Sequence, residues 1–255
     1  PLLRVTPAHL SFDSFSETDL AQQLCLLNFI PFHLIQPREC IGQAWTKKDK
    51  EKLAPNICAT TRQFNRVSSW VQIALLTQSD LVKRAQLFVK FVSLAKKCQG
   101  GFTIAKCTCL ELHDFSAVFA IYSALTSDAI FRLNKTRAAI GERSEKHMVS
   151  LEELCSVNQN HQSVRKALSG NVAFFMANDV AAALPCIPYI GLFLTDLTFI
   201  EEGNPDKLDG LINFKKRRFL AERIRSIKSY QSEHFTFPAH KPIQELLSFY
   251  GQDVD

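Results

Sequence analysis

Apolar residues recur three and four positions apart through most of the chain, which is the spacing of helices with one buried face. Leu20, Leu24 and Leu27 show this spacing near the start, and Phe88 and Val92 repeat it further on. Only nine glycines occur among 255 residues, so few tight turns are available to join strands. The pattern therefore predicts an all-α fold.

Capping residues, glycines and prolines divide this pattern into separate helices. Ser16 and Ser79 are the expected caps at two helix starts, and Gln99-Gly100-Gly101 is an expected stop. Residues 132–150 are more polar and predict a connecting segment. The expected helices are 16–31, one from 55 onward, 79–99, one from 114 onward, 149–157, 161–183, one from 189 onward, 213–230 and one after Pro242.

Prolines and glycines also mark the breaks late in the chain. Pro185-Cys186-Ile187-Pro188 stops a helix, since proline donates no backbone hydrogen bond and disfavours helix in the residue before it. Further turns are expected at Gly203-Asn204-Pro205-Asp206 and at Asp209-Gly210. No repeat of fixed period or low-complexity tract appears, so residues 1–255 are assigned to one domain.

Charge and hydropathy limit the classes of partner. The formal net charge of +5 falls short of a nucleic-acid footprint. The longest uncharged stretch, 180–195, is broken by Pro185 and Pro188 and is shorter than the ~20 residues of a membrane span. The chain opens at Pro1 without a secretory leader, which suggests an excised domain. Neither nucleic acid binding nor a membrane span is expected.

The eight cysteines are interpreted as reduced thiols of a cytosolic protein, because a chain of this length can bury a sufficient core without disulfides. Cys107, Cys109 and His113 suggest zinc, but this spacing lacks the usual second pair of ligands. No metal or cofactor is therefore expected. The basic run 215–218 is interpreted as the solvated face of an amphipathic helix, with a nuclear signal or phospholipid patch as alternatives.

Five ordered blocks resemble the exchange domain of the Son-of-sevenless type. Residues 185–206 read P-C-I-P-Y-I-G-L-F-L-T-D-L-T-F-I-E-E-G-N-P-D, and 211–218 read L-I-N-F-K-K-R-R. The other blocks are W-T-K-K-D-K at 45–50, the helix starting A-P-N at 54–56, and I-F-R-L at 130–133, with Y-Q at 230–231 ending the return helix. The resemblance covers nearly the whole chain and implies a helical hairpin at about 187–230.

The resemblance implies a guanine nucleotide exchange factor for Ras or Rap, or less readily Ral. Such a domain performs no covalent chemistry. Its hairpin wedges between the switch regions of a small GTPase and displaces magnesium and phosphate contacts. The chain lacks the phosphate-loop motif G-x-x-x-x-G-K-[ST], so it is expected to act on a GTPase rather than to be one. This activity implies a cytoplasmic protein working at the inner membrane surface, recruited by regions outside this chain.

By the same resemblance, Glu202 enters the phosphate loop, Thr198 and Phe199 approach the metal site, and Asn204 and Asp196 contact the displaced switch. The resemblance also implies an apolar pocket for an aromatic side chain of the GTPase, with Arg62 and Asn65 at its polar edge. The pocket residues are Ile57, Thr60, Phe119, Phe175 and Tyr189. The implied exchange residues are Thr195, Asp196, Thr198, Phe199, Glu202 and Asn204. The implied GTPase-binding residues are Trp45, Thr46, Ile57, Thr60, Arg62, Asn65, Phe119, Thr126, Phe175 and Tyr189.

Two positions depart from the family pattern. Asp114 and Thr126 stand where asparagine is usual, which bears on partner choice more than on fold. Each candidate also has a structural alternative: Glu201-Glu202 as solvated charge, Arg62 as a surface ion pair, and aromatic residues such as Tyr189 as core. The alternative functions are a non-catalytic adaptor with an exchange-like fold and a plain helical scaffold.

Overall fold

The computed structural model describes residues 12–100, 112–177 and 185–249, and for 170–177 it describes the course of the backbone only. Helices dominate these residues, as the apolar spacing predicts. The α-helices are α1 Glu17–His33, α2 Lys50–Leu53, α3 Pro55–Thr77, α4 Leu81–Gln99, α5 Phe115–Leu125, α6 Asp128–Phe131, α7 Asn134–Ala138, α8 Glu142–Cys155, α9 Asn158–Ala177, α10 Ile190–Gly203, α11 Phe214–Ser229 and α12 Lys241–Phe249. Three short 3₁₀ turns are η1 Phe12–Ser14, η2 Pro37–Cys40 and η3 Ala44–Thr46.

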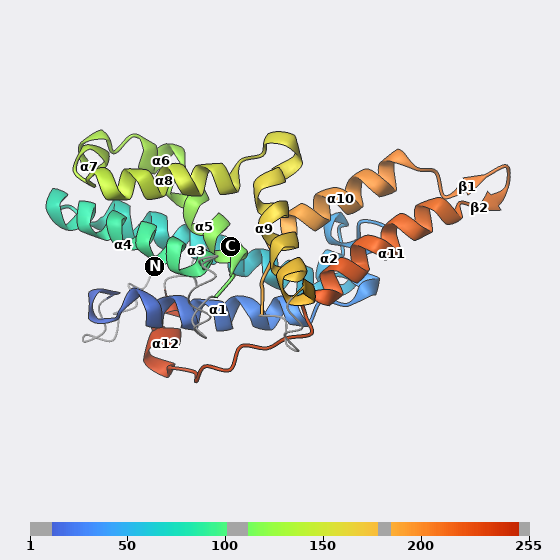
Figure 1. The fold of residues 1–255 in the computed structure, drawn as a ribbon, viewed down its shortest axis with the longest axis horizontal. Helices are drawn as coiled ribbons and strands as arrows, with labels where there is room; N and C mark the ends of the chain where they lie inside the picture. The colour runs from blue at the N-terminus through green and yellow to red at the C-terminus, as the bar shows by residue number, and fades with distance from the viewer. Residues whose placement is uncertain (1–11, 101–111, 178–184, 250–255) are drawn as a thin grey trace.

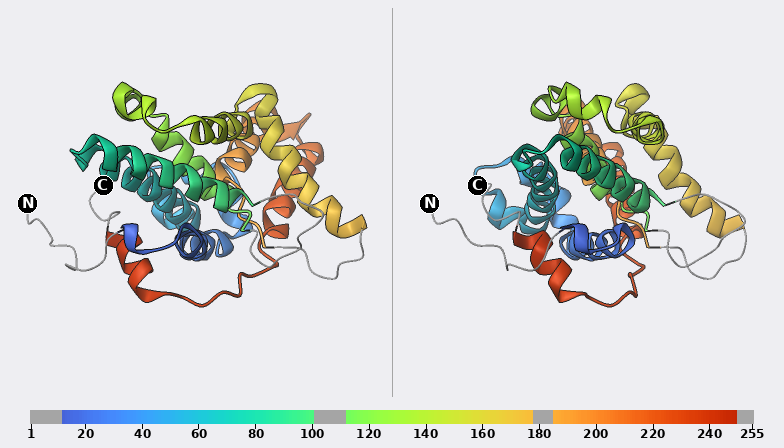
Figure 2. Two further views of the ribbon diagram at one scale, coloured as in Figure 1. Left: turned by 60° about the vertical axis from the view of Figure 1, so that its left-hand side comes forward. Right: turned by 90° about the vertical axis from the view of Figure 1, so that its left-hand side faces the viewer.

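Four long helices, α1, α3, α4 and α5, pack against one another and form the body of the molecule (Figure 2). Their shared interior holds fully buried aromatic rings, including Phe32, Phe88 and Phe91. α5 is buried along most of its length, whereas α8 covers α4 and α5 from outside and α12 lies against α1. Burial of such apolar surface is the main stabilising contribution to the fold.

Capping contacts explain several helix ends. Ser16 Oγ accepts the Asp19 N–H at 3.1 Å, as predicted for α1, and Gly100 ends α4 with φ +71°. The N-cap of α4 is Asp80, not the predicted Ser79, because the Asp80 carboxylate accepts the Lys83 N–H at 2.8 Å. α1 also continues past Pro31 to His33, since losing one backbone donor near the helix end does not stop the helix at once.

The polar segment 132–150, predicted as a connection, is largely helical and contains α7 and most of α8. α8 buries only four side chains, and its buried apolar residues lie in its last turns, so the predicted helix 149–157 matches only the second part of α8. The next helix, α9, begins at Asn158 and carries left-handed backbone at residues 159–161. Its predicted end at 183 lies outside the described residues.

A buried carboxylate fixes the start of α3. The Glu39 side chain is fully buried, and it accepts the backbone N–H of Asn56 at 2.8 Å and of Ile57 at 3.1 Å. The first N–H groups of a helix have no partner within the helix and carry partial positive charge. Glu39 therefore caps α3 across 17 positions of sequence and anchors η2 to the body.

The proline-bounded segment 185–188 is not helical, which confirms the predicted break. Ile187 pairs with the residues that precede α5: its N–H donates to His113 O at 3.0 Å and its carbonyl accepts the Phe115 N–H at 2.9 Å. α10 then begins at Ile190, with Tyr189 as its N-cap.

The predicted helical hairpin extends from the body and consists of α10 and α11 (Figure 1). At its tip a two-stranded ribbon pairs β1 Lys207–Leu208 with β2 Leu211–Ile212 around a turn at Asp209 and Gly210, both with positive φ. At its base the buried Gln231 amide donates to Phe32 O at 2.7 Å. Among the described residues, no helix combines the length and apolarity needed to cross a bilayer.

Candidate functional site

One face of α10 presents the predicted exchange residues to solvent. Thr195, Phe199 and Glu202 are exposed, with Phe199 68% exposed, while Leu192 and Leu197 are buried against the rest of the protein. Residues three or four positions apart share a helix face, so these side chains form one continuous stripe. Thr198 is half-buried at the edge of the stripe.

The stripe ends at a cavity of about 700 Å³ between the hairpin and the body. The lining is mostly apolar and aromatic, with threonine and serine hydroxyls at intervals. The lining residues are Trp45, Phe64, Phe119, Tyr122, Ser123, Thr126, Cys155, Val157, His161, Tyr189, Gly191, Leu194, Thr195, Thr198 and Phe199. A concave apolar site of this size can receive an aromatic side chain from a partner.

Stacked aromatic rings form one wall of the cavity. The ring of Tyr189 stacks on Phe119 with centroids 4.6 Å apart and tilts against Phe64 at 5.2 Å. Burial raises the pKa of the Tyr189 hydroxyl, so it remains a neutral hydrogen-bonding group. Tyr189 and Phe119 thus belong both to the packed interior and to the cavity wall.

The cavity differs from the predicted pocket at two positions. Ile57 and Thr60 do not line it, because both side chains are buried beneath the surface of α3 and the Thr60 hydroxyl donates to Asn56 O at 2.8 Å. Phe175 was also assigned to the pocket, but its side chain lies outside the described residues. The observed cavity is also lined by residues that the resemblance did not assign to the pocket: Trp45, Thr126 and Thr195.

Gly191 controls the position of the Tyr189 ring. A Cβ added at Gly191 would lie 2.4 Å from Tyr189 Cζ, closer than real Cβ atoms approach. We expect Gly191→Ala to turn the ring away from Phe119 and to weaken GTPase binding about 10-fold, the cost of about one aromatic pair. The measurement is the affinity of the domain for a nucleotide-free GTPase, by titration calorimetry.

A double-mutant cycle with Tyr189→Ala supplies the control for this prediction. Once the ring is gone, adding the Gly191 methyl group is expected to change the affinity no further. Equal losses from Gly191→Ala in both backgrounds would contradict the prediction, because the methyl group would then act without the ring.

The polar edge of α3 carries an exposed ion pair. Arg62 Nη1 lies 2.7 Å from Glu51 Oε2, and both side chains are about half-exposed. The hydrogen bond from Arg62 lowers the pKa of Glu51. Asn65, on the same helix, is exposed, and so is Thr46. The Thr46 hydroxyl donates to Gln43 O at 2.9 Å.

Asp196 faces inward rather than toward the exposed stripe. Its carboxylate is bound by both terminal nitrogens of Arg165, each at 2.9 Å, and it lies 3.7 Å from Arg223. The Asp196 side chain is only 13% exposed. Asp196 thus bridges α10 to α9 and α11 in this structure, and its contact with a switch region stays a prediction.

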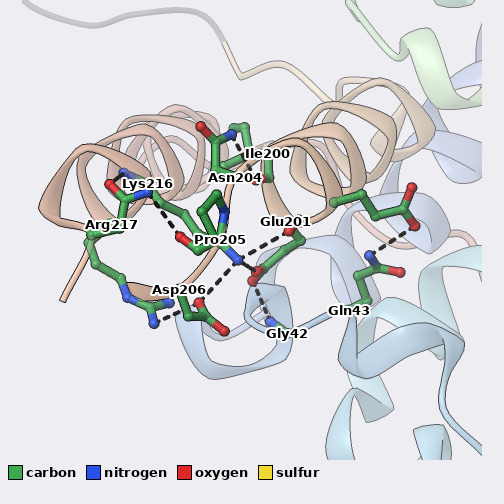
Figure 3. Close-up of polar contacts among 11 residues, drawn as sticks. Gly42, Gln43, Ile200, Glu201, Asn204, Pro205, Asp206, Lys216 and Arg217 are labelled. Atoms are coloured by element: carbon green, nitrogen blue, oxygen red, sulfur yellow. Dashed lines mark hydrogen bonds and ion pairs between the residues drawn. The ribbon is translucent and has the colours of Figure 1, made fainter. Parts of the chain in front are cut away.

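The two adjacent glutamates of α10 have different surroundings. Glu202 is exposed, and its Oε1 accepts a hydrogen bond from Gln43 Nε2 at 3.2 Å. Glu201 is largely buried and pairs with Lys216, and Asn204 Nδ2 donates to Ile200 O at 3.0 Å (Figure 3). Glu202 is therefore a solvated charge, whereas Glu201 is not. Within the basic run 215–218, Lys216 is likewise buried, which corrects its placement on a solvated face.

Six described cysteines are buried, and none of them forms a disulfide within the described residues: Cys25, Cys40, Cys58, Cys98, Cys155 and Cys186. Their reduced state stays an expectation. Burial raises the pKa of the Cys155 thiol, in the cavity wall, to about 12, so it is not a nucleophile there. The described residues hold no cluster of three metal-ligating side chains, and Cys107 and Cys109 lie outside them.

Sequence comparison identifies the family. The model of the RasGEF domain matches residues 19–218, which include the cavity, α10 and the start of α11. The chain belongs to the RasGEF domain family. This RasGEF domain is 33% identical to Ras guanine nucleotide exchange factor B of Dictyostelium discoideum, over 92% of the chain and 14% of that protein.

Two further relatives are also named as Ras guanine nucleotide exchange or releasing factors. It is 34% identical to Ras-specific guanine nucleotide-releasing factor 1 of Mus musculus, over 92% of the chain and 17% of that protein. It is 30% identical to Ras guanine nucleotide exchange factor J of Dictyostelium discoideum, over 92% of the chain and 26% of that protein. The chain thus spans about a quarter or less of each of these relatives.

Proposed function

We propose that this domain accelerates release of GDP from a Ras-family small GTPase, with Ras or Rap as the substrate. The observation that carries the proposal is the exposed Glu202 carboxylate, held on a projecting helix beside an apolar cavity. Family membership and the names of the relatives support the same activity.

The proposed mechanism rests on differential binding. A GTPase holds its nucleotide through a glycine-rich loop, a lysine and magnesium. An exchange factor shifts the equilibrium only if it binds the nucleotide-free state more tightly than the loaded state. Glu202 supplies a carboxylate that accepts charge-assisted hydrogen bonds from the loop once the phosphates have left. Thr198 and Phe199 occupy the space near the metal ion.

The cavity supplies binding energy in this mechanism. An aromatic side chain of the second switch region enters between Tyr189 and Phe199, with Trp45 and Thr126 at the rim. Buried aromatic anchors often dominate interface energy. Docking there holds the switch away from the nucleotide while α10 enters the phosphate site.

The direct test is release of fluorescent GDP from Ras, Rap and Ral across a range of domain concentrations. We expect saturable acceleration with Ras or Rap and a smaller effect with Ral. Binding to a GTPase without acceleration would identify the domain as an adaptor. Folded, monodisperse protein that neither binds nor accelerates any of the three would refute the proposal.

A further inference from the structure

A buried lysine lies between the two helices of the hairpin. Lys216, in the first turn of α11, is 3% exposed, and its Nζ lies 2.7 Å from Glu201 Oε2 and 3.1 Å from Glu201 O (Figure 3). It also lies 3.0 Å from Asp206 Oδ1, in the turn that follows α10. One ammonium group therefore joins the end of α10, the turn and the start of α11.

Glu201 extends this contact from the hairpin to the body. While its Oε2 pairs with Lys216, its Oε1 accepts the Gly42 N–H at 2.8 Å. Gly42 lies between η2 and η3 with φ +60°, a conformation that glycine adopts at little cost. The neighbouring Gln43 also has positive φ, and its amide reaches Glu202 at 3.2 Å.

Glu201 and Glu202 thus both contact the turn at residues 42–43. Glu201 does so as a buried charge, and Glu202 does so from the exposed stripe. The turn itself is fixed to the body, because η2 carries Glu39, the cap of α3. Contacts run from α3 through η2 and Gly42 to Glu201, and on to Lys216 and α11. These contacts join the hairpin to the body next to Glu202.

Electrostatics favour a specific geometry here over simple stabilisation. Burial lowers the pKa of Lys216, but the hydrogen bonds that its ammonium donates to Glu201 and Asp206 more than offset this, so the pKa is raised overall and the ammonium stays charged. A buried ion pair often adds little net stability, because both charges lose their hydration. It does restrict the distance and angle between its partners, which an apolar contact of the same size does not.

We propose that Lys216 is a positioning residue for nucleotide exchange: with Glu201 and the Gly42 backbone it holds the hairpin at the angle that presents Glu202 to the phosphate loop. This inference rests on the proposed exchange activity and adds a residue that contacts neither the cavity nor the exposed face of α10.

The test compares Lys216→Met with the double variant Glu201→Leu/Lys216→Met. The single variant leaves a buried carboxylate without its cation and is expected to lower the melting temperature. The double variant replaces the pair with apolar side chains of similar volume, so we expect its melting temperature to return to within about 3 °C of wild type. Arg217→Met, which removes a neighbouring exposed cation of the same helix, is the matched control.

Two readouts separate positioning from stability. In the double variant we expect faster amide hydrogen exchange at residues 40–46, with α3 and α5 unchanged. We expect kcat for GDP release to fall about 10-fold while KM for the GDP-loaded GTPase changes less than about 3-fold. Arg217→Met should match wild type in both.

Each outcome decides the inference. A well-folded double variant with wild-type kcat overturns it, whatever its amide exchange, because Glu202 would then be presented without the bridge. Unchanged amide exchange at 40–46 overturns it as well. If the wild-type domain accelerates no GTPase, the proposed function fails separately, and amide exchange alone decides whether the bridge holds the hairpin to the body.

Discussion

Replacing Glu202 with alanine is expected to slow GDP release about 100-fold at saturating domain, equivalent to about 2.7 kcal/mol of transition-state stabilisation. The side chain is exposed at the end of α10, with the Gln43 amide as a contact within the domain. Its removal therefore leaves the fold intact. The loss arises because the empty phosphate loop of the GTPase no longer meets a carboxylate.

Two further variants define the role of the charge. Glu202→Gln keeps the shape of the side chain and loses the charge, so about a 10-fold loss is expected, since neutral hydrogen bonds are weaker than charge-assisted ones. Glu142→Ala, on the distant helix α8, removes an exposed carboxylate that is paired only at the surface and should release GDP at the wild-type rate. Wild-type rates from Glu202→Ala would show that the carboxylate does not replace phosphate.

Much of the fold can be predicted from the sequence, since a helix with one buried face repeats its apolar residues every three or four positions. This signal finds α3, α4, α5 and α11, and the prolines around Ile187 locate the break before α10. It misses the first part of α8, where the stripe is sparse, and the start of α4, where Asp80 caps in place of Ser79. Spacing reports which face is buried, but it does not report which polar side chain caps a helix.

The surroundings of the candidate site are harder to predict, because its polar contacts join residues far apart in sequence. Asp196 is bound by Arg165, 31 positions away, and Glu201 by Gly42, 159 positions away. In sequence, Glu201 and Lys216 resemble solvated charges, and only packing shows that they are buried. The resemblance identified the residues of the exposed stripe, but it did not include the contacts that orient it.

The second large effect concerns Asp114, the residue that stands where the resemblance implies asparagine. Its carboxyl is completely buried; it accepts the Ala117 N–H at 2.9 Å and the Asn28 amide at 2.7 Å. Burial raises its pKa to about 7, and the hydrogen bonds from Ala117 and Asn28 offset this only partly. In the unfolded chain the same group has a pKa of about 3.9.

The sign of the pH effect follows from this difference. Between pH 4 and pH 7 the folded state holds a proton that the unfolded state has released, so the free energy of unfolding falls as pH rises through this window. Three pKa units correspond to about 4 kcal/mol of stability lost by pH 8. Lowered pKa values of His113, His147 and His161 act in the opposite direction, so only a variant isolates the contribution of Asp114.

Asp114→Asn is expected to remove the loss of folding stability that the Asp114 carboxyl causes as pH rises. The amide oxygen still caps α5, and about 1 kcal/mol is given up because Asn28 must rotate to pair with an amide. Urea unfolding at pH 5, 6, 7 and 8 should show the advantage of the variant over wild type growing as pH rises, from about 0.5 kcal/mol at pH 5 to about 3 kcal/mol at pH 8. Asp209→Asn, at the exposed turn of the hairpin, should follow wild type. Parallel profiles for wild type and Asp114→Asn would mean that the buried carboxyl does not titrate in this range.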